Sequence, residues 1–236
     1  MPLVVLTAIV VIAAVAFIRL DPGSALGRIS TVTRLDRLAS APAADGTDGV
    51  SRASTGDQVA FLRFVVDDIQ RAWTEQFAAA GLTYEPTRLV LFDRTVRSGC
   101  GTTDADVGPF YCPVDEDVYL EVGFFEELAN DFGAPGDFAE AYVVAHEFGH
   151  HVQTLLGITA DVGALEAADP TIANDLSVRT ELQADCLAGI WGHTAYEQSR
   201  LEPGDLDEAV TAAAAVGDDR LQAAATGSID PDTFTH

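Results

Sequence analysis

The stretch His146-Glu-Phe-Gly-His150 has the residue types and the spacing that hold a catalytic zinc ion. On a helix, histidines four residues apart project from one face, so their ring nitrogens can bind the same tetrahedral ion. Glu147 follows the first histidine and can take a proton from a water at the open coordination position. We therefore predict a zinc site with His146 and His150 as ligands and Glu147 as general base.

A catalytic zinc usually has a third protein ligand, and the best candidate lies downstream. Glu181 and Asp185 are four residues apart on the next long predicted helix. We predict that Glu181 binds the metal and that Asp185 accepts the other ring N–H of a ligating histidine. The alternative is two solvated carboxylates on a helix face. The apolar neighbours argue against it, since they indicate a turn buried on more than one side: Leu182, Ala184, Cys186 and Leu187.

Other side chains near these motifs are weaker candidates. His193 is the second choice for the third ligand, and it could instead donate to a transition-state oxyanion, as could Tyr142 or Tyr196. His151 lies about 100° round the helix from its neighbour His150, so it cannot share the same face. We interpret it as a supporting or surface histidine.

Apolar periodicity predicts the elements that must position these residues. The predicted helices cover about 57–77, 124–132, 137–156, 170–198 and 206–225, with strands over 88–92 and 118–122 and a loop from Cys100 to Cys112. Because most helices lie in the C-terminal half, we predict an α+β fold. Gly149, inside the metal-binding motif, would let another element approach the helix closely.

The overall charge excludes some classes of partner. The chain has 236 residues and a formal net charge of −24, and all of its basic residues are arginines. Such a field repels nucleic acid and anionic lipid headgroups, so neither is an expected partner. About half of the residues are apolar, which is enough for a sizeable core.

The first 56 residues differ in composition from the rest of the chain. Residues 2–18 form an uninterrupted apolar run, near the short limit for crossing a bilayer. We favour a membrane anchor over 1–20, with a secretory signal peptide as the alternative. Residues 21–56 have a linker composition, and 57–236 would form the catalytic domain. Four arginines after the apolar run favour a cytoplasmic location for the domain.

The three cysteines argue for the opposite orientation. Cys100 and Cys112 flank a short glycine-rich segment and could pair, which favours an oxidising compartment. We therefore expect an extracytoplasmic domain, with secretion as the alternative. Cys186 lies in a helical pattern and is interpreted as a buried small hydrophobe.

Several stretches, in order along 57–236, resemble the neutral zinc metallopeptidase family of bacteria: Gly108-Pro-Phe-Tyr-Cys-Pro113, Phe132-Gly-Ala-Pro-Gly-Asp-Phe138, Val144-Ala-His-Glu-Phe-Gly-His-His-Val-Gln153, Glu181-Leu-Gln-Ala-Asp-Cys186 and Gly217-Asp-Asp-Arg220. The resemblance implies a zincin-like fold, with a small sheet packed on the active-site helix and an N-terminal membrane segment. It also implies a glutamate as third zinc ligand, which corresponds to Glu181. Residues 118–122 would then be either a substrate-pairing edge strand or an ordinary core strand, and we rate the two equally.

Two functions remain open from the sequence. The first is hydrolysis of peptide bonds in a peptide or protein substrate by a zinc-activated water. The second is a non-catalytic, membrane-anchored scaffold with a structural zinc. Structural zinc usually has four protein ligands, so Cys186 would have to be recruited and Glu147 would have no task.

Overall fold

The computed structural model describes residues 56–104 and 107–216. The predicted membrane segment 1–20, residues 21–55 of the predicted linker 21–56 and residues 217–225 of the predicted helix 206–225 lie outside these ranges. Within them, none of the helices combines the length and the apolar character that a membrane crossing needs.

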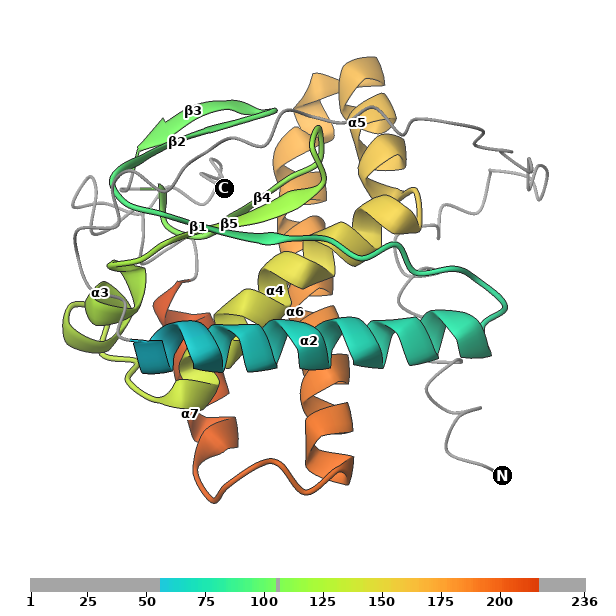
Figure 1. Cartoon of the computed structure of the whole chain (residues 1–236). Coiled ribbons are helices and arrows are strands. Elements are labelled where there is room, and N and C mark those ends of the chain that lie inside the picture. The colour runs from blue at the N-terminus through green and yellow to red at the C-terminus, as the bar shows by residue number, and fades with distance from the viewer. Residues whose placement is uncertain (1–55, 105–106, 217–236) are drawn as a thin grey trace.

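The described residues form an α+β fold (Figure 1). The helices are α2 (Gly56–Ala79), α3 (Phe124–Asn130), α4 (Asp137–Leu155), α5 (Ile158–Ala168), α6 (Ala173–Glu197) and α7 (Asp205–Ala215), with a short 3₁₀ turn, η2 (Pro170–Ile172). The strands are β1 (Leu89–Phe92), β2 (Thr95–Ser98), β3 (Gly101–Asp104), β4 (Phe110–Cys112) and β5 (Asp117–Glu121). The two motifs that are predicted to bind the metal lie on helices, α4 and α6, as expected.

The structure contains elements that the sequence pattern did not predict. The segment from Cys100 to Cys112 is not a loop, because it contains β3 and β4. These strands have three or four residues each, too few to show a period in the sequence. Helix α5 was also not predicted. Gly157 ends α4 in the left-handed conformation (φ 79°), as a C-terminal glycine does, but a new helix begins at the next residue.

The three-stranded sheet has the order β1-β5-β4 and mixed directions. β5 runs parallel to β1 and antiparallel to β4, and all five of its residues are buried. Of the predicted strand 118–122, residues 118–121 lie in this central strand, which excludes the edge-strand alternative for them. The edge on the α4 side is β4, whose pairing partner is β5 and which also contacts α4.

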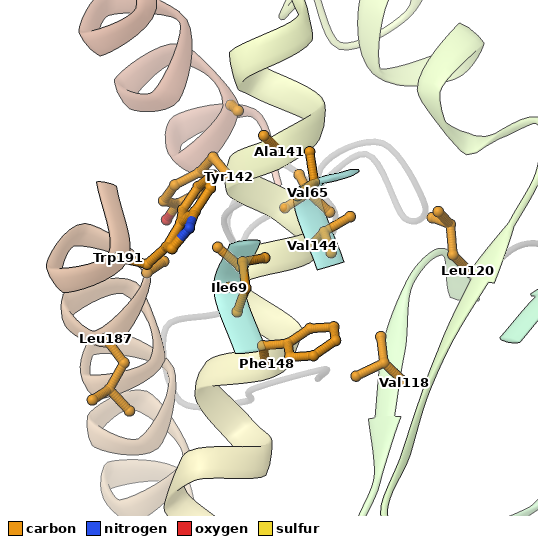
Figure 2. Close-up of a cluster of buried hydrophobic side chains, with 14 of the residues drawn as sticks. Val65, Ile69, Val118, Leu120, Ala141, Tyr142, Val144, Phe148, Leu187 and Trp191 are labelled. Atoms are coloured by element: carbon orange, nitrogen blue, oxygen red, sulfur yellow. The ribbon is translucent and has the colours of Figure 1, made fainter. Parts of the chain in front are cut away.

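The main core lies between the sheet, α2 and α4 (Figure 2). Phe148 of α4 is fully buried and points towards Val118 of β5, while Ile69 of α2 lies beside it. Burying a large apolar side chain of this kind stabilises the fold by about 1.5–3 kcal/mol. Phe148 lies between the two zinc-motif histidines in sequence, so the packing of its ring fixes how α4 is rotated relative to the sheet.

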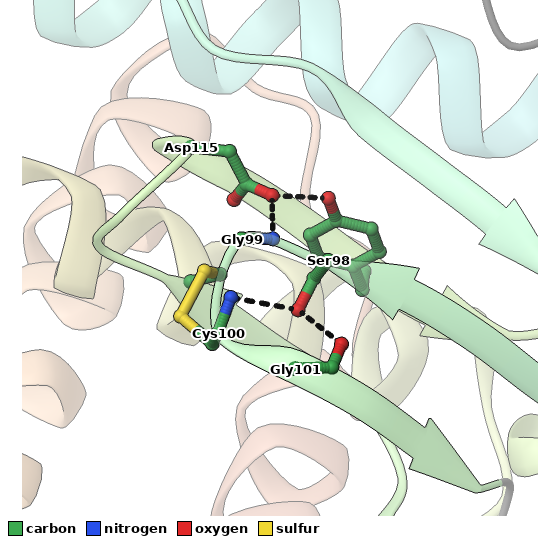
Figure 3. The surroundings of a disulfide bond; sticks show 7 residues. Ser98, Gly99, Cys100, Gly101 and Asp115 are labelled. Carbon is green, nitrogen blue, oxygen red and sulfur yellow. Dashed lines mark hydrogen bonds between the residues drawn. A yellow bond between two sulfur atoms is a disulfide. The ribbon is translucent and has the colours of Figure 1, made fainter.

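The other face of the sheet is covered by the β2–β3 hairpin. Cys100, in the hairpin turn, is joined by a disulfide to Cys112 of β4, with the Cα atoms 5.8 Å apart (Figure 3). The Asp115 carboxylate accepts hydrogen bonds from the backbone N–H of Gly99, at 2.5 Å, and from the Tyr119 hydroxyl, at 2.7 Å. The hairpin is thus attached to the turn between β4 and β5.

Helices α4 and α6 approach each other most closely at Gly149. A Cβ atom at this position would lie 3.0 Å from the backbone oxygen of Ala184 and 3.1 Å from its Cα. These contacts are tighter than most real Cβ contacts, and the atoms that would have to move belong to helix backbone, so glycine suits this position. The expectation that Gly149 admits a neighbouring element is confirmed.

The turn of α6 around Ala184 is buried on one side only. Ala184 and Leu187 face the core, whereas Leu182 is 62% exposed and Cys186 is a free, exposed thiol. The prediction of a turn buried on several sides, with Cys186 as a buried hydrophobe, is therefore wrong. On a helix with 3.6 residues per turn, Cys186 is rotated by about 200° from Ala184, so it faces away from α4.

We predict that Gly149→Ala lowers the free energy of unfolding by about 1–3 kcal/mol, because overpacking against helix backbone outweighs the better helix propensity of alanine. Gly189→Ala is the matched control: Gly189 is also on a helix, and a Cβ there would meet nothing within 4 Å. It should raise stability by about 0.4–1 kcal/mol. Urea unfolding of both variants measures this, and equal stabilisation of the two would contradict the close contact.

Candidate metal centre

Three side chains from α4 and α6 bring their donor atoms together. Nε2 of His146 lies 3.0 Å from Oε2 of Glu181 and 3.2 Å from Nε2 of His150, and His150 Nε2 lies 3.4 Å from the same carboxylate oxygen. Ligands bound to a tetrahedral zinc at about 2.0–2.1 Å are separated from one another by about 3.3 Å. The spacing of the three donors therefore fits one face of a zinc coordination tetrahedron.

The orientation of the His146 ring is fixed by Asp185. His146 Nδ1 lies 2.9 Å from Oδ1 of Asp185, and the Tyr142 hydroxyl donates to the same oxygen. Since an ionised carboxylate only accepts hydrogen bonds, Nδ1 carries a proton, and Nε2 is the ring nitrogen turned towards Glu181 and His150. This is the supporting role that was predicted for Asp185. Tyr142 assists that carboxylate instead of facing an open position.

Gln153 fixes the orientation of the His150 ring, a role that the sequence did not predict. Its amide Nε2 donates to the backbone oxygen of Thr180, at 2.7 Å, and to Oε1 of Gln183, at 3.0 Å. A backbone oxygen can only accept, so these contacts fix which way the amide is turned, and Oε1 must face Nδ1 of His150, at 2.8 Å. Nδ1 then carries the proton, and Nε2 is left to bind a metal.

The position of Gln153 in the sequence could have revealed this role. It lies three residues after His150, so it occupies the same face of the helix one turn further on. Its side chain is buried, with 1% exposed, which for an amide requires hydrogen-bond partners. A glutamine in a helix is common, however, and only the α6 backbone beside it identifies its task.

The electrostatic environment favours a cation between the two helices. Burial by itself lowers the pKa of His146, but hydrogen bonds to Asp185 and Glu181 raise it to about 10. Burial raises the pKa of Glu181, but hydrogen bonds from His146 and His150 hold it well below its usual range. The carboxylates thus stabilise positive charge where the imidazoles meet, which is the place that a divalent cation would occupy.

Glu147 lies beside this group without belonging to it. Glu147 is the residue after His146 on α4, and it is buried, with 9% of the residue exposed. Among the described residues, the acidic, histidine and cysteine side chains that converge here are His146, His150 and Glu181. This leaves one position of a tetrahedral ion without a protein ligand from that part of the chain.

The remaining candidates are not brought to the centre. His193 lies twelve residues after Glu181 on α6, which is about 18 Å along a helix. Its ring is half exposed, and its Nε2 is 4.0 Å from Glu197 of the same helix. Tyr196 is also exposed and stacks on His193. Neither side chain can reach an oxyanion at the metal residues.

Comparison with known proteins agrees with this geometry. The family model described as "Putative neutral zinc metallopeptidase" matches residues 3–236. The chain belongs to this family. The metallopeptidase family therefore implies zinc as the cofactor, and the donor set of two imidazoles and a carboxylate fits that ion.

Curated relatives match a large part of the chain. The chain is 48% identical over 177 residues to "Uncharacterized protein YpfJ" of Escherichia coli (strain K12), covering 75% of the chain and 62% of the relative. It is 48% identical over 166 residues to "Uncharacterized protein Rv2575" of Mycobacterium tuberculosis (strain ATCC 25618 / H37Rv), covering 65% and 55%. The chain thus spans less than two thirds of the length of these relatives. No solved structure matches the chain.

We predict that Gln153→Met weakens zinc binding by about tenfold to a hundredfold, because His150 loses the acceptor that fixes its ring. Zinc affinity is measured by competition with a coloured chelator. Gln70→Met is the control, since Gln70 lies on α2, accepts a hydrogen bond from the backbone N–H of Thr87, at 3.0 Å, and makes no hydrogen bond to the metal residues within the described part of the chain. The control should lose stability and keep its zinc affinity. Equal zinc affinity in Gln153→Met and the parent protein would contradict the assignment.

Proposed function

We propose that this member of the neutral zinc metallopeptidase family hydrolyses peptide bonds and that His146, His150 and Glu181 hold its zinc. One observation carries the proposal: three donors with zinc-like spacing converge in the described structure and leave a position open, with the Glu147 carboxyl group on the adjacent residue. An open position is what distinguishes catalytic from structural zinc sites.

In this proposal Glu147 is the general base. A zinc ion held by the three residues would lower the pKa of the attacking water and polarise the carbonyl of the scissile bond. The Glu147 carboxylate accepts the proton of the water and delivers it to the nitrogen of the leaving amine. Asp185 and Gln153 keep both imidazoles turned towards the centre, so neither ring has to reorganise during the reaction.

The substrate would bind as an extended chain along β4. This strand is the edge of the sheet nearest α4, and it runs antiparallel to β5. The backbone oxygen of Cys112 accepts from Glu116 N–H, on the β5 side. Because backbone groups alternate along a strand, the N–H and C=O of Tyr111 point to the open side. The arrangement would be zincin-like, with β4 in the role that the sequence offered to residues 118–122.

The alternative is a scaffold with a structural zinc. It requires a fourth protein ligand, and Cys186 was the candidate. Cys186 is exposed and does not belong to the converging group of described residues. This favours the catalytic proposal.

We predict that Glu147→Gln keeps zinc and lowers kcat for peptide hydrolysis by about a hundredfold to ten-thousandfold, because the variant has no carboxylate to accept the proton. The matched control is Glu140→Gln, seven residues earlier on α4, which should keep the parent rate. Zinc content and cleavage of labelled casein are measured on the same preparations. A Glu147→Gln variant that cleaves at the parent rate would refute the mechanism.

We also propose that residues 1–20 anchor the protein in a membrane, with the domain on the extracytoplasmic side. The apolar run and the Cys100–Cys112 disulfide support this, since disulfides persist in oxidising compartments. The full chain should stay in the membrane fraction after alkaline carbonate extraction, and a variant lacking residues 2–18 should be soluble. A shortened, soluble product of the full chain would instead indicate a cleaved signal peptide.

A further inference from the structure

His151, next to the proposed ligand His150, makes contacts that zinc binding does not explain. Its ring is almost fully buried, with 1% of the residue exposed. Nε2 lies 2.7 Å from the backbone oxygen of Glu85, and Nδ1 lies 3.2 Å from the hydroxyl of Tyr111. The ring is thus held from both sides, by the segment before β1 and by the edge strand β4.

The hydrogen-bond partners of the His151 ring fix where one of its protons lies. The backbone oxygen of Glu85 can only accept a hydrogen bond, so Nε2 of His151 carries the proton. A hydrogen bond joins Nδ1 of the same ring to the Tyr111 hydroxyl.

Tyr111 is the residue of β4 whose backbone faces the open edge. Its side chain leaves the sheet on the face that is packed against α4, where its hydroxyl contacts His151. The next residue, Cys112, points to the other face, where the disulfide joins it to Cys100. The strand is thus fastened to the active-site helix on one face and to the β2–β3 hairpin on the other.

We propose that His151 is a positioning residue that holds β4 beside the metal centre through Tyr111, and so sets how well an extended peptide binds. The inference rests on the proposed peptidase function. His150 and His151 are consecutive on one rigid helix, so a bond from β4 to His151 fixes the distance between the peptide-binding edge and a zinc ligand. A substrate paired with β4 would then present its scissile bond in a constant register.

Tyr84 provides a control of the same chemistry. Its ring packs edge-on against His151, with centroids 5.6 Å apart, the same separation as for Tyr111. The Tyr84 hydroxyl is buried and has no hydrogen-bond partner in the described part of the chain. Tyr84→Phe and Tyr111→Phe therefore remove the same atom next to the same ring, and only the second removes a bond to His151.

The test compares these two variants in the full, zinc-loaded chain, with fluorescently labelled, unfolded β-casein as substrate. Tyr111→Phe should raise KM by about threefold to tenfold, the value of one hydrogen bond, with kcat within about twofold of the parent. Strand pairing is made in the ground state and in the transition state alike, which is why KM changes and kcat does not. Tyr84→Phe should leave both constants unchanged, and both variants should keep the parent zinc content.

Hydrogen exchange of the 110–112 amides gives a second readout that does not need activity. Tyr111→Phe should speed exchange in β4 in the zinc-loaded and metal-free protein, and Tyr84→Phe should not. Equal effects of the two variants on exchange and KM, or a fall in kcat at constant KM, would overturn the proposal. If the parent chain cleaves no casein with zinc bound, the peptidase function fails, and the exchange experiment alone then decides whether His151 fixes β4.

Discussion

The contact between α4 and α6 at Gly149 and Ala184 is the constraint on which the site depends. Two donors of the metal centre come from α4 and one from α6, so their spacing follows from the distance between the helices. A single Cβ atom at Gly149 would meet the α6 backbone at 3.0 Å. The core fixes the rotation of α4 about its own axis, because Phe148 is buried against the sheet. Local packing thus determines the geometry of the donors.

Three faces of helix α4 have different roles at the site. One face carries His146, His150 and Gln153 towards α6. A second carries Phe148 into the core, and a third carries His151 towards β4. Each histidine is oriented by a different acceptor or donor: a carboxylate for His146, an amide for His150, and a hydroxyl for His151. The stretch of eight residues from 146 to 153 therefore connects metal, core and edge strand.

The sequence predicted the features that depend on one helix. The spacing of His146 and His150 and the spacing of Glu181 and Asp185 each act within one or two turns, and the glycine at 149 can be recognised from residue type alone. The features that it did not predict arise between elements. Gln153 is identified by the α6 backbone, β4 by its pairing with β5, and the exposure of Cys186 by the rotation of α6. His193 was suggested by residue type, and the length of α6 carries it away from the centre.

The central claim is that two imidazoles and one carboxylate hold a zinc ion with a position left for water. X-ray absorption at the zinc edge of the purified full chain tests it most directly, because the technique separates nitrogen and oxygen ligands from sulfur. The account predicts one zinc per chain, two imidazole ligands and only oxygen besides them, at about 2.0–2.2 Å. A sulfur ligand at about 2.3 Å, as recruitment of Cys186 would give, or a chain that binds no zinc, would contradict it.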